Sequence, residues 1–192
     1  MLRVAIVGNI ASGKSVVEDI LSRREFSVLD TDKLCHYLLG TTPQIAEAFE
    51  NFDIFENENI SRDKLAKLVF NSSELKKKLE DILYPLVRKG INEFFSEHES
   101  EKVCFVAIPL LFEAGMEYLF DKIVFVYADD EIRKKRLMQR NNYSAEYAQI
   151  RMDAQLGQYE KLKKADIVIY NNSTIENLEL QVENFLLKLS EN

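Results

Sequence analysis

The stretch best suited to chemistry lies near the start of the chain, where GNIASGKS occupies residues 8–15. Gly8, Gly13, Lys14 and Ser15 fit the pattern G-x-x-x-x-G-K-[ST]. In such a stretch, the backbone N–H groups of a glycine-rich turn and the positive end of a helix surround a phosphate group. The lysine reaches the outer phosphates and the serine hydroxyl binds Mg²⁺. The stretch therefore predicts a site for a nucleotide with Mg²⁺ at Ser15.

The residues on either side of this loop favour the same prediction. The β-rich run RVAIV at residues 3–7 precedes it, and a helical pattern of apolar residues follows it. A phosphate-binding loop requires this order of strand, loop and helix. The alternative is a glycine-rich turn that only packs a helix on a strand.

An acceptor for the phosphate would need a carboxylate to orient or deprotonate its hydroxyl group. The second apolar run ends in LDTD, which supplies Asp30 and Asp32. Two carboxylates one residue apart point to opposite sides of an extended chain, so only one can face the phosphate. We expect Asp32 to be that residue. The alternative is that both carboxylates are solvated turn residues or helix caps.

A basic stretch at residues 133–140 supplies cations that could neutralise a transferring phosphoryl group. Arg136 and Arg140 are four residues apart and would share one face of a helix. We expect these two arginines to act at the phosphates. The alternative is a solvated charged face, and it is the favoured reading for Lys134 and Lys135.

The remaining pattern predicts how these residues are positioned. Five short apolar runs are expected to form a parallel sheet buried on both faces, with helices between them. They lie at residues 3–7, 26–29, 103–108, 122–127 and 166–170. Residues 33–100 have helical periodicity and no convincing strand, which indicates a helical insert in which Pro85 bends or restarts a helix.

Composition narrows the class of protein. The chain has 192 residues, 46% of them hydrophobic, which is enough for one α/β domain with an insert. The net charge of −7 argues against bulk nucleic-acid binding. No apolar run approaches the roughly 20 residues that span a bilayer. Two cysteines without a CxxC motif and two isolated histidines give no metal cluster. We expect a cytoplasmic protein with no membrane or nucleic-acid partner; the oligomeric state is left open.

Taken together, the ordered motifs resemble those of the dephospho-coenzyme A kinase family over nearly the whole chain. The family pattern is a GGIGSGKST loop, D-A-D, a His-Pro pair, P-L-L-F-E, a K-R-x-x-x-R lid and a late a-D-x-V-I-x-N. Here the matching stretches are Gly8 to Val16, Asp30 to Asp32, Tyr84-Pro85, Pro109 to Glu113, Lys135 to Arg140 and Ala165 to Asn171.

The resemblance implies a P-loop kinase fold of the nucleoside-monophosphate-kinase type, with a five-stranded parallel core, a helical acceptor-binding insert and a helical lid. Residues 1–32 and 101–192 would form the nucleotide-binding core, residues 33–100 the insert, and residues 133–155 a lid within the core. The implied reaction is transfer of the γ-phosphate of ATP, with Mg²⁺, to the ribose 3′-hydroxyl of dephospho-CoA.

The resemblance also implies roles for individual residues. Asp32, Lys14 and Arg140 would be catalytic, and Asn171 would close over the adenine. The ATP contacts would come from Gly8, Ala11, Ser12, Gly13, Lys14, Ser15, Val16, Arg136 and Asn171. The acceptor contacts would come from Asp32, Tyr84, Leu111 and Glu113. By itself, Glu113 is equally compatible with a helix cap on the surface.

Four positions depart from the family pattern. Asn9 and Ala11 replace loop glycines, and Ala11 needs dihedral angles that a residue with a side chain can adopt. Val16 replaces a second hydroxyl residue, but Ser15 still supplies the Mg²⁺ ligand. Tyr84 replaces the usual histidine, which predicts altered acceptor affinity rather than loss of activity.

Two other functions are compatible with the loop alone. One is a nucleoside or nucleoside-monophosphate kinase of the same architecture, because the acceptor cannot be read from the insert. The other is a nucleotide-dependent switch without a small acceptor. The chain has no N-K-x-D guanine-reading motif, and its basic lid residues favour a kinase over the switch.

Overall fold

A computed structural model describes residues 1–57 and 59–190. Its main sheet is five-stranded and parallel, with the strand order β2-β5-β1-β6-β7. The strands are β1 (Leu2–Gly8), β2 (Val28–Asp30), β5 (Val103–Ala107), β6 (Lys122–Tyr127) and β7 (Ile167–Tyr170). The predicted fold class and all five strands are confirmed, and their bounds differ from the prediction by two residues at most.

The chain divides into two compact units. The first comprises Met1–Asp30 and the chain from Glu97 onward, and the second comprises Thr31–Ser96. The first unit therefore contains the whole parallel sheet, and the second is one uninterrupted excursion between strands β2 and β5. The insert expected at residues 33–100 overlaps this unit, and its acceptor-binding role stays a prediction.

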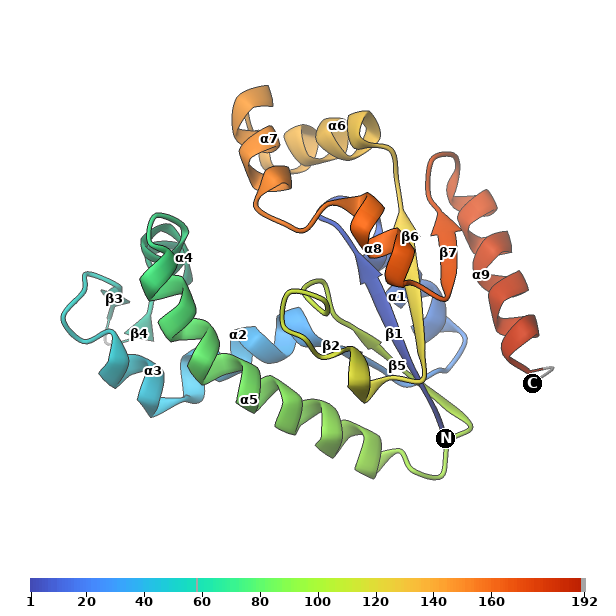
Figure 1. The fold of residues 1–192 in the computed structure, drawn as a ribbon, viewed down its shortest axis with the longest axis horizontal. Coiled ribbons are helices and arrows are strands. Elements are labelled where there is room, and N and C mark those ends of the chain that lie inside the picture. The colour runs from blue at the N-terminus through green and yellow to red at the C-terminus, as the bar shows by residue number, and fades with distance from the viewer. Residues whose placement is uncertain (58, 191–192) are drawn as a thin grey trace. The chain divides into compact units, whose positions relative to one another are not determined.

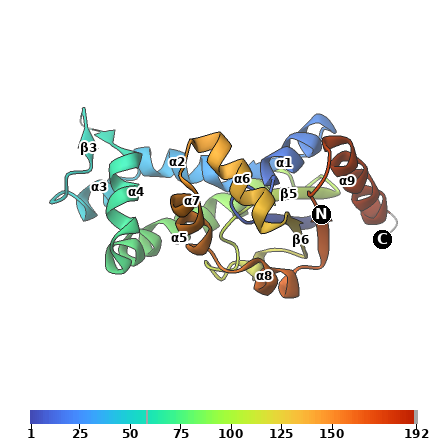
Figure 2. The same cartoon turned by 90° about the horizontal axis from the view of Figure 1, so that it is seen from above.

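Strand β1 is the middle strand of the first unit and is buried on both faces. Its residues Val4 to Val7 have no exposed surface, which explains the continuous apolar run. Helices α1 (Lys14–Arg23) and α9 (Ile175–Ser190) contact one another and pack on one face of the sheet. Figures 1 and 2 show these two helices side by side. The glycine-rich loop follows β1 directly, so the most buried strand of the sheet supports it.

Helices α6 and α7 of the first unit lie beside the loop. After the turns and short 3₁₀ segment at Glu117–Leu119, the chain forms strand β6 and then helices α6 (Asp130–Asn141), α7 (Ala145–Asp153) and α8 (Gln158–Lys164). Helices α6 and α7 pack together through Leu137, Ala148 and Met152. Ile10 and Ala11 of the loop pack against the same cluster. The basic helix therefore lies beside the loop, because the two share an apolar contact.

The second unit has its own small core of Ile45, Phe49, Ile54 and Leu65. Its elements, in chain order, are α2 (Thr31–Thr41), α3 (Pro43–Ala48), β3 (Phe55–Glu56), β4 (Asn59–Ile60), α4 (Arg62–Phe70) and α5 (Ser73–Glu97). One sequence expectation is wrong here, because strands β3 and β4 form an antiparallel pair that the sequence did not indicate. Helix α5 continues through Pro85, so of the two alternatives expected at Pro85, a bend or a restart, the restart is excluded.

None of the helices in the described ranges has the length and apolar character that a membrane span requires.

Candidate active site

The glycine-rich loop between β1 and α1 is the centre of the candidate site. Gly13 precedes helix α1 with φ 96°, a left-handed conformation that favours glycine. Ala11 also has a positive φ of 62°, although it carries a side chain. Ala11 therefore adopts the left-handed conformation that glycine would adopt more easily, and this conformation costs energy in any L-residue.

Gly13 is also required by what lies next to it. A Cβ atom built on Gly13 would lie 2.0 Å from Nδ2 of Asn171. That Nδ2 donates a hydrogen bond of 2.8 Å to the carbonyl oxygen of Ser12, and Asn171 is 6% exposed. The Asn171 amide is thus packed against the loop backbone. A contact with adenine, as expected for Asn171, stays a prediction.

Arg136 is brought to the same part of the loop. Its Nη2 donates to the backbone oxygen of Asn171 at 3.0 Å, and its Nη1 approaches the oxygen of Ser12 at 3.5 Å. Arg140, one turn further along α6, is exposed and its Nε donates to Asn141 Oδ1 at 2.9 Å. The structure therefore places Arg136 at the loop, whereas the hydrogen bond of Arg140 is to the end of its own helix.

Lys14 and Ser15 begin helix α1. The ammonium group of Lys14 lies 2.6 Å from Oε1 of Glu18, one turn along the helix. Ser15 is exposed at the first turn. Val16 is half-buried and packs on the apolar core below the loop. Glu18 was not expected from the sequence, and an acidic residue four positions after the lysine was the available signal.

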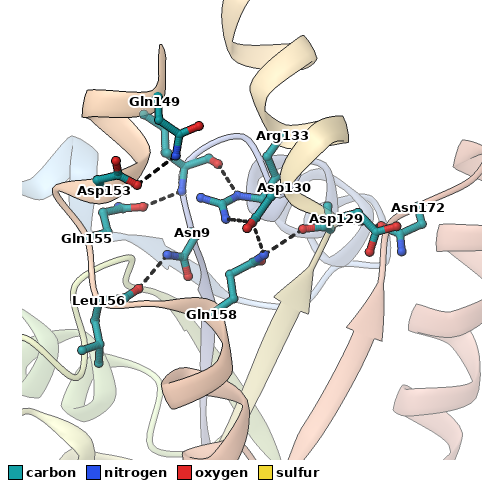
Figure 3. A network of polar contacts seen from close by, with 12 residues as sticks. Asn9, Asp129, Asp130, Arg133, Gln149, Asp153, Gln155, Leu156, Gln158 and Asn172 are labelled. Atoms are coloured by element: carbon teal, nitrogen blue, oxygen red, sulfur yellow. Dashed lines mark hydrogen bonds and ion pairs between the residues drawn. The ribbon is translucent and has the colours of Figure 1, made fainter. Parts of the chain in front are cut away.

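A polar network connects the outer part of the loop to α6 and to the segment that joins α7 and α8 (Figure 3). The N–H of Ile10 donates to Gln155 Oε1 at 2.7 Å, and its carbonyl accepts from Arg133 Nε at 3.0 Å. Asn9 Nδ2 donates to the carbonyl of Leu156 at 2.8 Å. Sequence reasoning missed Gln155 and Arg133, since neither belongs to a motif that the loop pattern requires.

Arg133 is the most deeply buried charge in this network, at 3% exposed. Burial lowers the pKa of its guanidinium group, and the carboxylate of Asp130, 2.8 Å from Nη1, opposes that change. Gln158 Nε2 donates to the same carboxylate at 2.8 Å. Arg133, which donates to the carbonyl of Ile10 in the loop, is thereby fixed by Asp130 on its own helix.

The turn after β5 holds Leu111 and Glu113, both expected to contact the acceptor. Leu111 is completely buried. Glu113 forms an ion pair of 2.8 Å with Lys161, which has no exposed surface and also donates to the carbonyl of Pro109 at 3.1 Å. Glu113 accepts a further hydrogen bond from the N–H of Leu156 at 3.1 Å. Glu113 therefore has a structural partner in the core, and its contact with an acceptor stays a prediction.

The other expected acceptor residues belong to the second unit. Strand β2 ends at Asp30, and Asp32 is exposed in the first turn of α2. Tyr84 is half-buried in the middle of α5. A close approach within this unit fixes α2 against α5, because a Cβ on Gly90 would lie 2.7 Å from a methyl group of Leu34.

Known proteins similar to this chain agree on one family. The family model described as dephospho-CoA kinase matches residues 2–177. A dephospho-CoA kinase of Oceanobacillus iheyensis is 38% identical, with 97% of each chain covered.

Two solved structures resemble this chain over nearly its full length. A Thermus thermophilus protein, TT1252, has a TM-score of 0.86 at 34% identity, with coverage of 98% of this chain and 97% of that one. The dephospho-CoA kinase from Campylobacter jejuni has a TM-score of 0.76 at 31% identity and the same coverage. With a parallel sheet, a phosphate-binding loop and these relatives over nearly its full length, the chain belongs to the dephospho-CoA kinase family.

Proposed function

We propose that this chain transfers the γ-phosphoryl group of ATP to the ribose 3′-hydroxyl of dephospho-CoA, giving CoA and ADP. The observation that carries the proposal is the family match over residues 2–177, which spans both the phosphate-binding loop and the helical unit. The loop geometry supports the donor half of the reaction, because positive φ angles at Ala11 and Gly13 turn the backbone at the start of helix α1.

On the donor side, the backbone from Gly8 to Val16 holds the phosphates, and Lys14 neutralises the outer ones. Ser15 fits a magnesium ligand, because its exposed hydroxyl lies in the first turn of α1 beside Lys14 and Mg²⁺ prefers oxygen donors. A Mg²⁺ ion held there would supply neutralisation of the phosphate charge. Ser12 is 1% exposed, and its carbonyl oxygen accepts the hydrogen bond from Asn171 Nδ2 that holds this part of the loop.

On the acceptor side, the unit Thr31–Ser96 binds dephospho-CoA, and the carboxylate of Asp32 orients the 3′-hydroxyl and accepts its proton. Tyr84 contributes a hydrogen bond or a stacking surface to the acceptor. Of the two residues after strand β5 that were expected to contact the acceptor, Glu113 is 23% exposed and keeps that role in the proposal, whereas Leu111 has no exposed surface.

Two arginines act at the transferring group, and Asn171 acts at the adenine. Arg136 and Arg140 stabilise the negative charge that develops on the phosphoryl oxygens. Asn171 contacts the adenine while its amide holds Ser12. Residues 133–155 form the lid, and its closure excludes water from the reaction.

Product analysis by mass spectrometry tests the proposal. Purified protein is incubated with Mg-ATP and dephospho-CoA, beside a Lys14→Ala variant and a reaction without Mg²⁺. We expect CoA and ADP in equal amounts from the wild-type protein only. In parallel reactions, nucleosides and nucleoside monophosphates replace dephospho-CoA as acceptor. Turnover of one of these without any CoA would overturn the acceptor assignment, and ATP hydrolysis without an acceptor would favour a switch protein.

A further inference from the structure

In the outer part of the phosphate-binding loop, Ala11 has a strained backbone conformation, and the preceding Ile10 makes two hydrogen bonds through its backbone. Ala11 has φ 62°, in the left-handed region that L-residues rarely adopt. Such a conformation persists only where the surroundings fix it. The neighbouring Ile10 supplies that fixation, since hydrogen bonds hold both its N–H and its carbonyl group.

The residues that hold Ile10 come from distant parts of the chain (Figure 3). Gln155 Oε1 accepts from the Ile10 N–H at 2.7 Å, and Arg133 Nε donates to the Ile10 carbonyl at 3.0 Å. Asn9, at 3% exposed, adds a third connection through Leu156 at 2.8 Å. The loop is thus held by α6 and by the segment that follows α7, in addition to its own turn.

The segment that follows α7 is itself fixed in place. The N–H of Leu156 donates to Glu113, and Glu113 is paired with the fully buried Lys161. Gln155 precedes Leu156 directly and is half-buried. The side-chain carbonyl of Gln155 therefore reaches Ile10 from a restrained backbone, because Leu156 donates to Glu113 and accepts from Asn9.

We propose that Gln155 is a positioning residue for nucleotide binding, which holds Ile10 so that the strained Ala11 keeps the loop in its phosphate-binding conformation. The inference rests on the proposed ATP-dependent function. Gln155 acts through the backbone of the loop. Its removal therefore weakens ATP binding and leaves dephospho-CoA binding unchanged.

The test compares Gln155→Met, which keeps the length of the side chain and removes the acceptor, with Gln181→Met. Gln181 lies on α9, and its Oε1 likewise accepts from a backbone N–H, that of Tyr170, at 2.9 Å. Loss of the acceptor leaves a backbone N–H unpaired, so we expect Mg-ATP to bind roughly 5- to 50-fold more weakly in Gln155→Met. Calorimetric titration measures the affinity, and the KM for ATP should rise by a similar factor with little change in kcat.

A second variant distinguishes positioning from a general loss of structure. Ala11→Gly removes the strain at position 11, so the loss caused by Gln155→Met should fall to roughly 3-fold or less in that background. The melting temperatures report whether each variant is folded, and Gln155→Ala replaces the methionine variant if it is not.

Three results are decisive. Weaker ATP binding that Ala11→Gly restores supports the proposal. Unchanged ATP binding in Gln155→Met, or an equal loss in the Ala11→Gly background, overturns it. The proposed function fails separately, because a wild-type protein that binds Mg-ATP but forms no CoA still reports on Gln155 through the binding titration.

Discussion

Lys14 Nζ lies 2.6 Å from Glu18 Oε1, and the two side chains are only 12% and 10% exposed. The lysine that the loop pattern assigns to the outer phosphates is therefore paired with a carboxylate of its own helix. If Lys14 binds the outer phosphates as proposed, their oxygens compete with this carboxylate for one ammonium group. Because the pair is shielded from water, the competition is stronger than it would be on an open helix surface.

This competition predicts that Glu18→Gln strengthens ATP binding. We expect the Kd for Mg-ATP to fall roughly 3- to 10-fold, since the amide keeps the size of the side chain and removes its charge. Asp19→Asn is the matched control, because Asp19 is the adjacent exposed acid on the same helix. Equal effects of the two substitutions would point to net charge alone and reject the local pairing.

Gly13 is predicted to tolerate no side chain. Gly13→Ala places a Cβ 2.0 Å from Asn171 Nδ2 in a residue with φ 96°. We expect ATP binding to be lost and the free energy of unfolding to fall by about 2–4 kcal/mol. Gly157→Ala serves as control, because Gly157 has φ −58° and a Cβ added there would meet no atom within 4 Å. Denaturant unfolding and nucleotide titration of both variants measure the contrast.

The buried ion pair below the loop predicts a stability defect that a second substitution repairs. Lys161→Met leaves Glu113, at 23% exposed, without its cation. We expect a loss of about 2–4 kcal/mol in the free energy of unfolding, below the value for a fully buried pair. Adding Glu113→Gln should recover part of that loss and keep an acceptor for Leu156. A double variant less stable than Lys161→Met would contradict this account.

Asp32 is predicted to affect catalysis and not ATP affinity. If Asp32 accepts the proton of the 3′-hydroxyl, Asp32→Asn should lower kcat about 10²- to 10⁴-fold. Asp30→Asn, two residues earlier at the end of β2, is the comparison. Steady-state kinetics with calorimetric ATP titration separates the two effects. Wild-type turnover by Asp32→Asn would eliminate the base role.

Cys104 predicts a pH-dependent contribution to stability. The side chain is completely buried and its thiol donates to Glu101 at 3.6 Å. Burial, assisted by Glu101, raises the pKa of the Cys104 thiol to about 11. The folded state thus favours the neutral thiol. This contribution is fully present below the thiol pKa of the unfolded chain, about 8.5, and is lost as the pH rises through the folded value.

Denaturant unfolding at pH 8 and pH 10.5 checks this prediction. The stability advantage of wild type over Cys104→Ala should shrink by about 2 kcal/mol at the higher pH. The other groups that titrate in this range are common to both proteins. An advantage that stays constant with pH would exclude a titrating thiol at this position.

Much of the core could be predicted from sequence because its signals are local. The run at residues 3–7 is apolar without alternation, and the structure buries Val4 to Val7 completely. The loop pattern placed Gly13, Lys14 and Ser15 at the start of a helix, and they are found there. Strands β3 and β4 could not be predicted, because two residues each are too short to show a period of two.

The parts of the site that were missed depend on contacts between distant residues. Lys161 lies in a lysine-rich stretch that resembles a solvated face, and only the fold shows that Glu113 and Pro109 enclose it. Gln155 and Ile10 are far apart in sequence, so no spacing rule connects them. The sequence likewise showed that Ala11 replaces a loop glycine, but only the structure shows that Ala11 adopts the left-handed conformation.

The strand order has a consequence for how the chain folds during synthesis. Both neighbours of β1 come late, since β5 begins at Val103 and β6 at Lys122. The unit Thr31–Ser96 is contiguous and is complete before either strand leaves the ribosome. Because synthesis adds roughly 5–20 residues per second, strand β1, which precedes the phosphate-binding loop, stays without its neighbouring strands for about 5–20 s. During this interval β1 is an unpaired apolar segment of the nascent chain, open to aggregation and chaperone binding.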